Sequence, residues 1–217
     1  MLVDDQGAKF VMMLLPAIQP ASRLLGFQRL DASQAWQLSE LAGNIIELSS
    51  EGASATLTVA MRLVWEAQSL GEPVGWVAGR QSSFYPPDAL ENGVDLDALA
   101  VVRVPEARDI GKAADYLVRS GAFGLVVLDL GEETKLVERQ LTRLLGLARK
   151  HGTAVVCLTH KPEASQSLGS SVSLRGPIYR ERLRSGVFSC ELCVTKDKRR
   201  PPGWRHAEVC RGPAGLR

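Results

Sequence analysis

Blocks of hydrophobic residues alternate along the chain with segments whose apolar residues recur at helical spacing. Apolar runs with little alternation predict buried strands at residues 44–49, 73–77, 99–104, 123–129 and 153–159. Helical periodicity predicts helices at residues 56–69, 88–92, 107–119 and 132–150. Strands and helices that alternate in this way predict a mostly parallel sheet with helices on both faces.

The last quarter of the chain has a different pattern. Shorter strands with alternating polarity are predicted at residues 171–175, 186–195 and 203–210, and they are expected to add antiparallel to the sheet edge. No repeat and no second hydrophobic pattern is present, so we expect residues 31–217 to form one α/β core domain.

The N-terminal residues 1–30 are predicted to form a helical segment, broken at Pro16 and Pro20. Phe10, Met12, Met13 and Leu14 make it more apolar than one amphipathic stripe requires. Such a segment either packs on the body or binds another subunit, as an interaction arm. No apolar run reaches membrane-spanning length, and a basic start with a cleavage site is missing, so a cytoplasmic protein without membrane contact is expected.

Composition adds a strong asymmetry of charge. The 217 residues are 45% hydrophobic, which suits one domain with a full core, and the formal net charge is +2. Residues 1–160 hold 14 Lys and Arg against 19 Asp and Glu, whereas residues 161–217 hold 12 against 5. The basic last quarter indicates either a surface that faces a polyanion or a solvated basic edge.

The four cysteines suit a reducing compartment. Cys190 and Cys193 form a C-x-x-C pair, but within a strand these positions face opposite sides, and no second pair is present. We therefore expect structural cysteines and no metal site.

Polar residues at the carboxyl ends of the predicted strands are where open α/β sheets place ligand chemistry. Asp129 and His160 occupy such positions, and each is either a site residue or a satisfied polar group that caps a turn. The turn after the first strand contains Gly52, Ser54 and Ala55 but lacks the lysine of a phosphate-binding loop. This turn can hold an anion only weakly, through helix N-terminal amides.

Four segments together carry a resemblance to a known family. They are IIELSSEGASATLTVAMRLVWEAQSLGEPVGWV from residue 45, GVDLDAL from 93, KAADYLVRSGAFGLVVLDL from 112 and VTKDKRRPPGWRHAEV from 194. Their order and spacing over about residues 40–212 resemble the RecA recombinase family. The resemblance implies a RecA-like core: a mostly parallel central sheet flanked by helices, with antiparallel strands at the C-terminal edge.

The chain departs from that family at its nucleotide site. By resemblance, Ser54 replaces the phosphate-binding lysine, Ala55 the threonine, Arg80 the glutamate that activates water, and His160 the γ-phosphate sensor, while Asp129 keeps the metal-facing aspartate. The resemblance therefore implies the fold without ATP hydrolysis and without a cofactor. Within the superfamily the pattern is most similar to the ImuA family of accessory proteins.

Two basic sets are candidates for binding DNA. The first comprises Lys196, Lys198, Arg199, Arg200 and Arg205, with Trp204 available to stack on an unpaired base. The second comprises Arg175, Arg180, Arg182 and Arg184 around Tyr179. The alternative is a solvated hairpin with Trp204 in the core.

The ImuA resemblance implies an accessory factor in DNA-damage-induced translesion synthesis. Its expected partners are DNA (single-stranded or a primer–template), an ImuB-like protein with an error-prone polymerase, and RecA or a second copy through the N-terminal arm. The expected location is the cytoplasm, at the nucleoid. A SulA-like cell-division inhibitor that binds only protein is the first alternative, and a residual ATPase that depends on Asp129 is the second.

Overall fold

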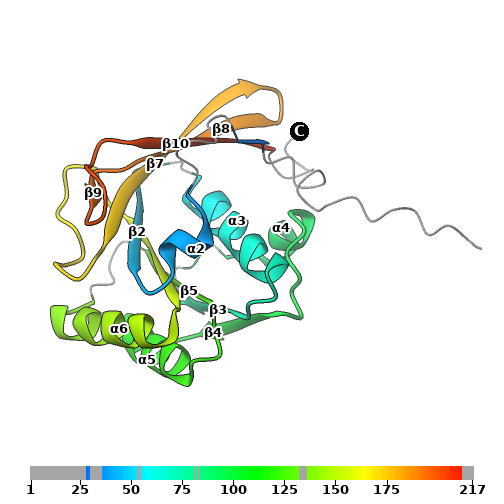
Figure 1. Ribbon diagram of the computed structural model, residues 1–217. Helices are drawn as coiled ribbons and strands as arrows, with labels where there is room; N and C mark the ends of the chain where they lie inside the picture. The colour runs from blue at the N-terminus through cyan, green and yellow to red at the C-terminus, as the bar shows by residue number, and fades with distance from the viewer. Residues whose placement is uncertain are drawn as a thin grey trace, which may run out of the picture.

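The computed structural model describes residues 28–29, 36–52, 55–80, 82, 84–131 and 136–211 (Figure 1). Of the N-terminal segment that was predicted to be helical, only Gln28 and Arg29 are described, and they form strand β1 (Gln28–Arg29). Phe10, Met12, Met13 and Leu14 lie outside the described residues. Ser54 of the phosphate-loop turn lies outside them as well.

A parallel sheet forms the centre of the molecule. Its strands are β2 (Ile45–Ser50), β3 (Val74–Ala78), β4 (Leu99–Arg103), β5 (Leu125–Gly131) and β6 (Ala154–His160). They lie side by side in the order β2-β6-β5-β3-β4, and every neighbouring pair is parallel. The five strands predicted from apolar runs are thus confirmed, with ends shifted by one or two residues.

Helices cover the sheet on both faces. They are α2 (Leu38–Leu41), α3 (Thr56–Ser69), α4 (Pro86–Glu91), α5 (Ile110–Ser120), which follows a 3₁₀ turn at Ala107–Asp109, and α6 (Glu138–His151). Figure 1 shows α2, α3 and α4 on one side and α5 with α6 on the other. The Ser120-Gly121 stop is confirmed, because Gly121 ends α5 in the left-handed region at φ 69°. No helix among the described residues is long and apolar enough to span a membrane.

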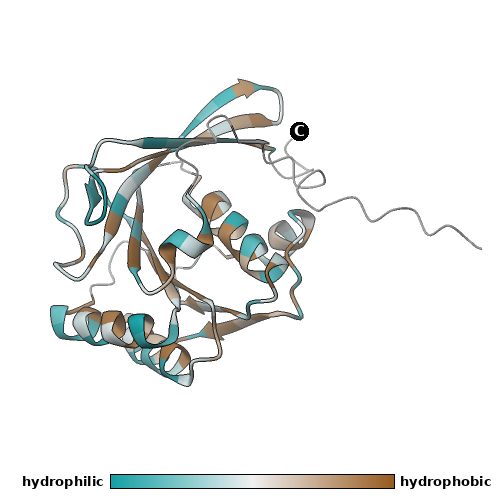
Figure 2. Ribbon diagram, viewed as in Figure 1, coloured by the Kyte–Doolittle hydropathy of each residue, from teal (hydrophilic) through white to brown (hydrophobic). Residues whose placement is uncertain are grey.

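The C-terminal strands extend the sheet and curve over α3. They are β7 (Leu174–Arg184), β8 (Val187–Cys193), β9 (Lys196–Asp197) and β10 (Arg205–Arg211). The order continues β2-β7-β8-β10-β1, with antiparallel pairing beyond β7. Figure 2 shows brown, hydrophobic positions on both the parallel strands and this curved extension, around α3.

Strand β7 is longer than the sequence predicted. It pairs parallel with β2 from Leu174 to Pro177 and antiparallel with β8 from Ile178 onward, so the prediction that it ends at residue 175 was wrong. Gly176 and Pro177 lie where the strand passes from one partner to the next. A Cβ at Gly176 would come within 2.6 Å of the Cys193 carbonyl oxygen, so glycine permits the close approach of the two strands.

Two hydrophobic cores lie on opposite faces of the sheet. The core around α3 includes Trp36, Trp76 and Leu63 and reaches Leu192 of β8. The core beneath α5 and α6 is built from residues such as Leu128 and other buried aliphatic side chains. Because one helix is packed between the parallel strands and the curved extension, the two parts of the sheet share one core.

A buried cluster of charged side chains joins α3 to strand β10 of the C-terminal extension. The Arg62 side chain contacts Glu66 at 2.7 Å and Glu208 of β10 at 3.0 Å, and each of the three side chains is at most 16% exposed. His206 Nε2 lies 2.7 Å from the same Glu208 carboxylate. These contacts satisfy charges that would otherwise strongly destabilise the core.

Candidate nucleic-acid interface

The turn that resembles a phosphate loop follows strand β2 directly. Gly52 is exposed and adopts φ +66°, and Ala55 immediately precedes α3 with only 1% of its surface exposed. A buried methyl group therefore occupies the position that, by the resemblance, corresponds to the family's metal-binding hydroxyl.

Asp129 holds a neighbouring turn in place. Its carboxylate accepts a 2.6 Å hydrogen bond from the Ser82 hydroxyl, and the Ser82 oxygen in turn accepts one from the Phe84 backbone N–H at 3.2 Å. This geometry matches the turn-capping alternative considered for Asp129. Arg80 lies exposed in the same turn after β3.

His160 lies at the end of β6, as expected. Its Nδ1 atom is 3.4 Å from the Ser50 hydroxyl at the end of β2, so the two residues link adjacent parallel strands. Asp129, His160 and the Gly52 turn therefore all lie toward the carboxyl ends of the central strands, where the sequence placed them.

Glu47 organises a buried polar cluster that the sequence analysis missed. It lies in the middle of β2 with none of its surface exposed, and its carboxylate is 2.5 Å from Lys161 Nζ and 3.7 Å from Arg175 Nε. The same carboxylate accepts hydrogen bonds from the Ser167 hydroxyl at 3.0 Å and the Leu168 N–H at 2.9 Å. A glutamate within an apolar strand was the available signal, because a buried carboxylate requires partners.

Residues 161–171, which we call the pinned loop, are attached to the body along their length. Lys161 donates to the Gln166 carbonyl at 2.6 Å, and Arg175 donates to the Glu163 carbonyl at 3.1 Å. Glu138 accepts hydrogen bonds from both Ser170 and Ser171, and these bonds lower the pKa of Glu138, Ser170 contributing most. The Ser/Gly-rich loop is therefore fixed by charged side chains. Arg175 is buried at 6% exposure, so its assignment to a surface basic set was wrong.

The cations of residues 196–200, which we call the basic turn, contact groups of the protein itself. Lys196 donates to the Gly169 carbonyl at 3.0 Å, and Lys198 donates to the Ser170 carbonyl at 2.6 Å. Burial lowers the pKa of Lys196, and the nearby Lys198 lowers it further. Arg199 donates to the Glu40 carbonyl, and Arg200 is 2.5 Å from the Glu40 carboxylate at the end of α2.

Trp204 and Arg205, next to the basic turn, are also engaged within the molecule. Trp204 is half-buried against the α3 core, donates its Nε1 proton to Asp197 at 3.0 Å and lies 5.6 Å beneath the Arg200 guanidinium. Arg205 is 3.4 Å from Glu191. This arrangement favours the alternative in which Trp204 belongs to the core, while DNA contact by the turn stays a prediction.

Residues 179–188, which we call the hairpin arm, present the second basic set at the surface. Arg180, Arg182 and Arg184 are all exposed on β7, and within the described part of the chain none of them has an ion-pair partner. Register places Arg180 opposite Cys190 and Arg182 opposite Phe188, so these two arginines share one face of the hairpin. The pairing is irregular between Arg182 and Arg184, which lies opposite Val187. The acidic Glu181 lies opposite Ser189 on the other face.

Aromatic and apolar groups accompany these arginines. The Arg180 guanidinium lies 5.0 Å from the Phe188 ring centroid, and Leu183 is 52% exposed. Tyr179 is 46% exposed and donates a 2.5 Å hydrogen bond to Glu163 of the pinned loop, which raises the pKa of Tyr179 to about 12. An exposed row of cations beside aromatic rings is the arrangement that binds single-stranded nucleic acid.

Comparison with known proteins finds similarity to RecA proteins of several bacteria. The chain is 25% identical to the protein RecA of Fusobacterium nucleatum subsp. nucleatum over 197 residues, which covers 74% of this chain and 52% of that protein. It is 26% identical to RecA of Mycobacterium leprae over 140 residues, covering 56% of this chain and 20% of the relative. With RecA of a Nocardioides species the identity is 35% over 88 residues, covering 40% of the chain and 25% of the relative. No family model matches the chain.

The chain spans about half the length of the first of these relatives and less of the other two. The similarity, together with a mostly parallel sheet that carries antiparallel strands at its C-terminal edge, supports the RecA-like superfamily. The fold is accordingly an α/β RecA-like core.

Proposed function

We propose that this chain is a RecA-like accessory factor that binds DNA through the hairpin arm and does not hydrolyse nucleotide. The observation that carries the proposal is the row formed by Arg180, Arg182 and Arg184, which is exposed and lacks carboxylate partners among the described residues. Guanidinium groups on alternate strand positions can contact successive phosphates without reading the bases. We propose single-stranded DNA or a primer–template junction as the ligand.

The absence of hydrolysis is part of the same proposal. The buried Ala55 supplies no hydroxyl for a metal ion, and Asp129 is hydrogen-bonded to the turn that contains Ser82. Phosphoryl transfer depends on a lysine, a metal ion and a residue that positions water. At the positions that match those residues by the resemblance, this chain has other residue types. These features support a binding role.

The resemblance to the ImuA family supplies the biological setting of the proposal. We propose a role in translesion DNA synthesis, beside an ImuB-like protein and an error-prone polymerase, at the nucleoid. RecA or a second copy would engage the N-terminal arm. This setting is consistent with the similarity to RecA proteins and with a surface suited to DNA.

Fluorescence anisotropy with labelled single-stranded DNA, over a series of salt concentrations, tests the proposal. The triple variant Arg180→Ala, Arg182→Ala, Arg184→Ala should lose most binding, and its salt slope should become shallower by about 2, because three phosphate contacts are removed. Lys198→Ala with Arg199→Ala and Arg205→Ala is the control, since it removes the same charge from side chains that contact carbonyl or carboxylate groups of the protein. Binding that survives the first variant and disappears in the control would assign the interface to the basic turn.

Two further outcomes would replace the proposal. If the wild-type protein does not bind DNA at low salt, a protein-only role such as that of a SulA-like inhibitor becomes the better account. ATP turnover that is abolished by Asp129→Asn would establish a residual ATPase.

A further inference from the structure

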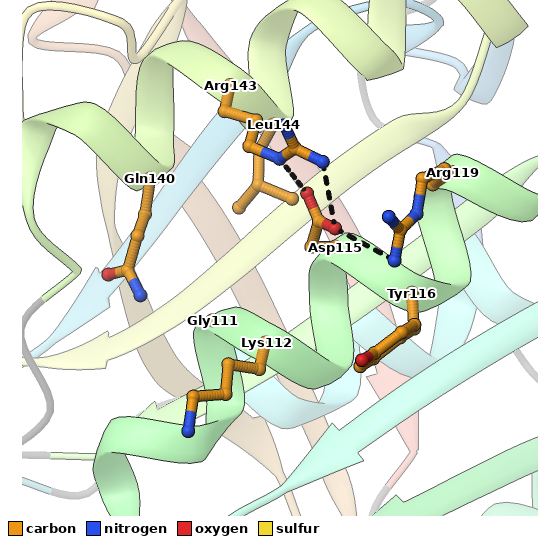
Figure 3. A pocket seen from close by; sticks show the side chains of 8 residues that line it. All are labelled: Gly111, Lys112, Asp115, Tyr116, Arg119, Gln140, Arg143 and Leu144. Atoms are coloured by element: carbon orange, nitrogen blue, oxygen red, sulfur yellow. Dashed lines mark hydrogen bonds and ion pairs between the residues drawn. The ribbon is translucent and has the colours of Figure 1, made fainter.

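Side chains of α5 and α6 line a groove (Figure 3). The two helices lie on the face of the sheet opposite α3 (Figure 1). The helices approach closely at Gly111, where an added Cβ would lie 2.7 Å from the Gln140 side-chain nitrogen. The groove encloses about 310 Å³. Its lining residues are Gly111, Lys112, Asp115, Tyr116, Arg119, Gln140, Arg143 and Leu144.

Hydrogen-bond donors dominate this groove. Asp115 lies between the two arginines: it accepts two hydrogen bonds from Arg143, the longer at 3.3 Å, and lies 3.3 Å from Arg119 (Figure 3). Each guanidinium carries five N–H donors, so N–H groups remain for a ligand on both arginines. The Gln140 oxygen already accepts from the Val137 N–H at 3.1 Å, which leaves its NH₂ group beside the groove floor at Gly111.

An exposed aromatic ring adds apolar surface to these donors. Tyr116 is 68% exposed, and the Arg119 guanidinium lies 4.9 Å from its ring centroid. Arg119 and Arg143 are about half exposed, at 48% and 58% of their side-chain surface. Tyrosine and arginine together are the residues enriched at the energetic centres of protein interfaces.

We propose that the α5–α6 groove is a docking site for an acidic peptide segment of a partner protein. Carboxylates of the segment would bind Arg119 and Arg143, and an apolar side chain would pack on Tyr116. A nucleic-acid backbone fits less well, because its regularly spaced phosphates would meet the central Asp115 carboxylate. A peptide can place a carboxylate at each arginine and an uncharged residue between them. The site goes beyond the proposed DNA-binding function, since it lies on different elements from the hairpin arm.

Binding of two fluorescein-labelled peptides to the full chain tests this inference. One probe alternates glutamate with leucine, and the matched probe carries glutamine in place of every glutamate. The acidic probe should bind saturably, and the glutamine probe at least about tenfold more weakly. Arg119→Ala with Arg143→Ala should weaken the acidic probe by a similar factor, and Tyr116→Ala should weaken both probes.

Helix α6 also supplies a control variant that removes the same amount of charge outside the groove. Arg149→Ala with Lys150→Ala removes two exposed cations of α6 that do not line the groove, and it should leave peptide binding unchanged. Arg119→Lys with Arg143→Lys keeps the charge and should retain part of the affinity if the fold is intact. The inference is overturned if wild-type protein fails to bind the acidic probe, or if the control variant loses as much as the groove variant.

The same variants separate this inference from the proposed function. The groove variant should bind single-stranded DNA with the affinity of wild type, and the triple arginine variant of the hairpin arm should bind the acidic probe normally. If the groove variant instead loses DNA affinity and keeps the peptide, the groove belongs to a nucleic-acid surface.

Discussion

The hairpin arm and the basic turn lie close together in sequence and are both rich in cations, yet the fold uses those cations differently. In the basic turn, Lys196 and Lys198 bind carbonyl groups of the pinned loop, and Arg200 pairs with Glu40. In the hairpin arm, Arg182 and Arg184 point from an exposed strand and have no ion-pair partner among the described residues. Formal charge in a sequence is therefore a poor measure of the charge that a ligand can reach.

The difference follows from what each segment lies against. The basic turn packs beside the pinned loop, and its lysine ammonium groups donate to the Gly169 and Ser170 carbonyls. The hairpin arm extends past the last residues that pair β7 with β2, and among the described residues its three arginines meet no carboxylate partner there. One basic segment thus stabilises the fold, and the other remains available for binding.

Removing the buried carboxylate of β2 that holds the pinned loop should have the largest effect on stability. Glu47→Gln leaves the ammonium of Lys161 and the guanidinium of Arg175 without their buried counter-charge. We expect the free energy of unfolding to fall by about 3–5 kcal/mol, measured by urea denaturation. Glu138→Gln, which alters an exposed anchor of the same loop, is the control and should lower the stability much less than Glu47→Gln does. Equal losses in the two variants would contradict a special role for Glu47.

Removing the two lysines of the basic turn should have an intermediate effect. Lys196→Ala with Lys198→Ala deletes two charge-assisted hydrogen bonds to the pinned loop, so the stability should fall by about 1–3 kcal/mol. Amide hydrogen exchange in residues 169–172 should become faster. Arg182→Ala with Arg184→Ala is the matched control, and its stability should stay within about 0.5 kcal/mol of wild type. If the lysine variant keeps wild-type stability and exchange, those cations are not structural.

The smallest expected effect concerns the contact between the hairpin arm and the pinned loop. The hydrogen bond to Glu163 raises the pKa of Tyr179 from 10.0 to about 12, so folding favours the neutral phenol. The contribution of this bond to stability is therefore fully present below pH 10 and is lost as the pH rises through about 12. Absorbance at the phenolate band should show one tyrosine that ionises near pH 12.

Two variants identify that tyrosine. Tyr179→Phe should remove the transition near pH 12. Glu163→Gln should move it to lower pH, because the phenol then loses its charged acceptor. A transition that neither substitution alters would show that Tyr179 does not bridge the loop and the arm.

The alternation of apolar runs and helical segments allowed most of the fold to be predicted. Buried parallel strands require near-continuous apolar residues, so β2, β3, β5 and β6 were visible without any partner information. The passage of β7 from one partner to the next at Gly176 was hidden, because glycine followed by proline ordinarily marks a break.

The candidate site was predicted less well. Arg180, Arg182 and Arg184 were recognised as basic, but so was Arg175, which is buried beside Glu47. Nothing in local sequence separates these arginines, since each lies in the same polar stretch. The role of Glu47 could have been suspected from its place in an apolar strand, but its partners lie more than a hundred residues away.

The sequence by itself determined the alternating strands and helices and the absence of a lysine from the turn after the first strand. These features depend on side-chain polarity at neighbouring positions, which local periodicity records. Only the tertiary structure decided which cations are available, that Glu47 holds the pinned loop, and that α5 and α6 form a donor-rich groove. The physical reason is that the environment of a charge depends on groups brought near it by folding, and their distance along the chain does not reveal their distance in space.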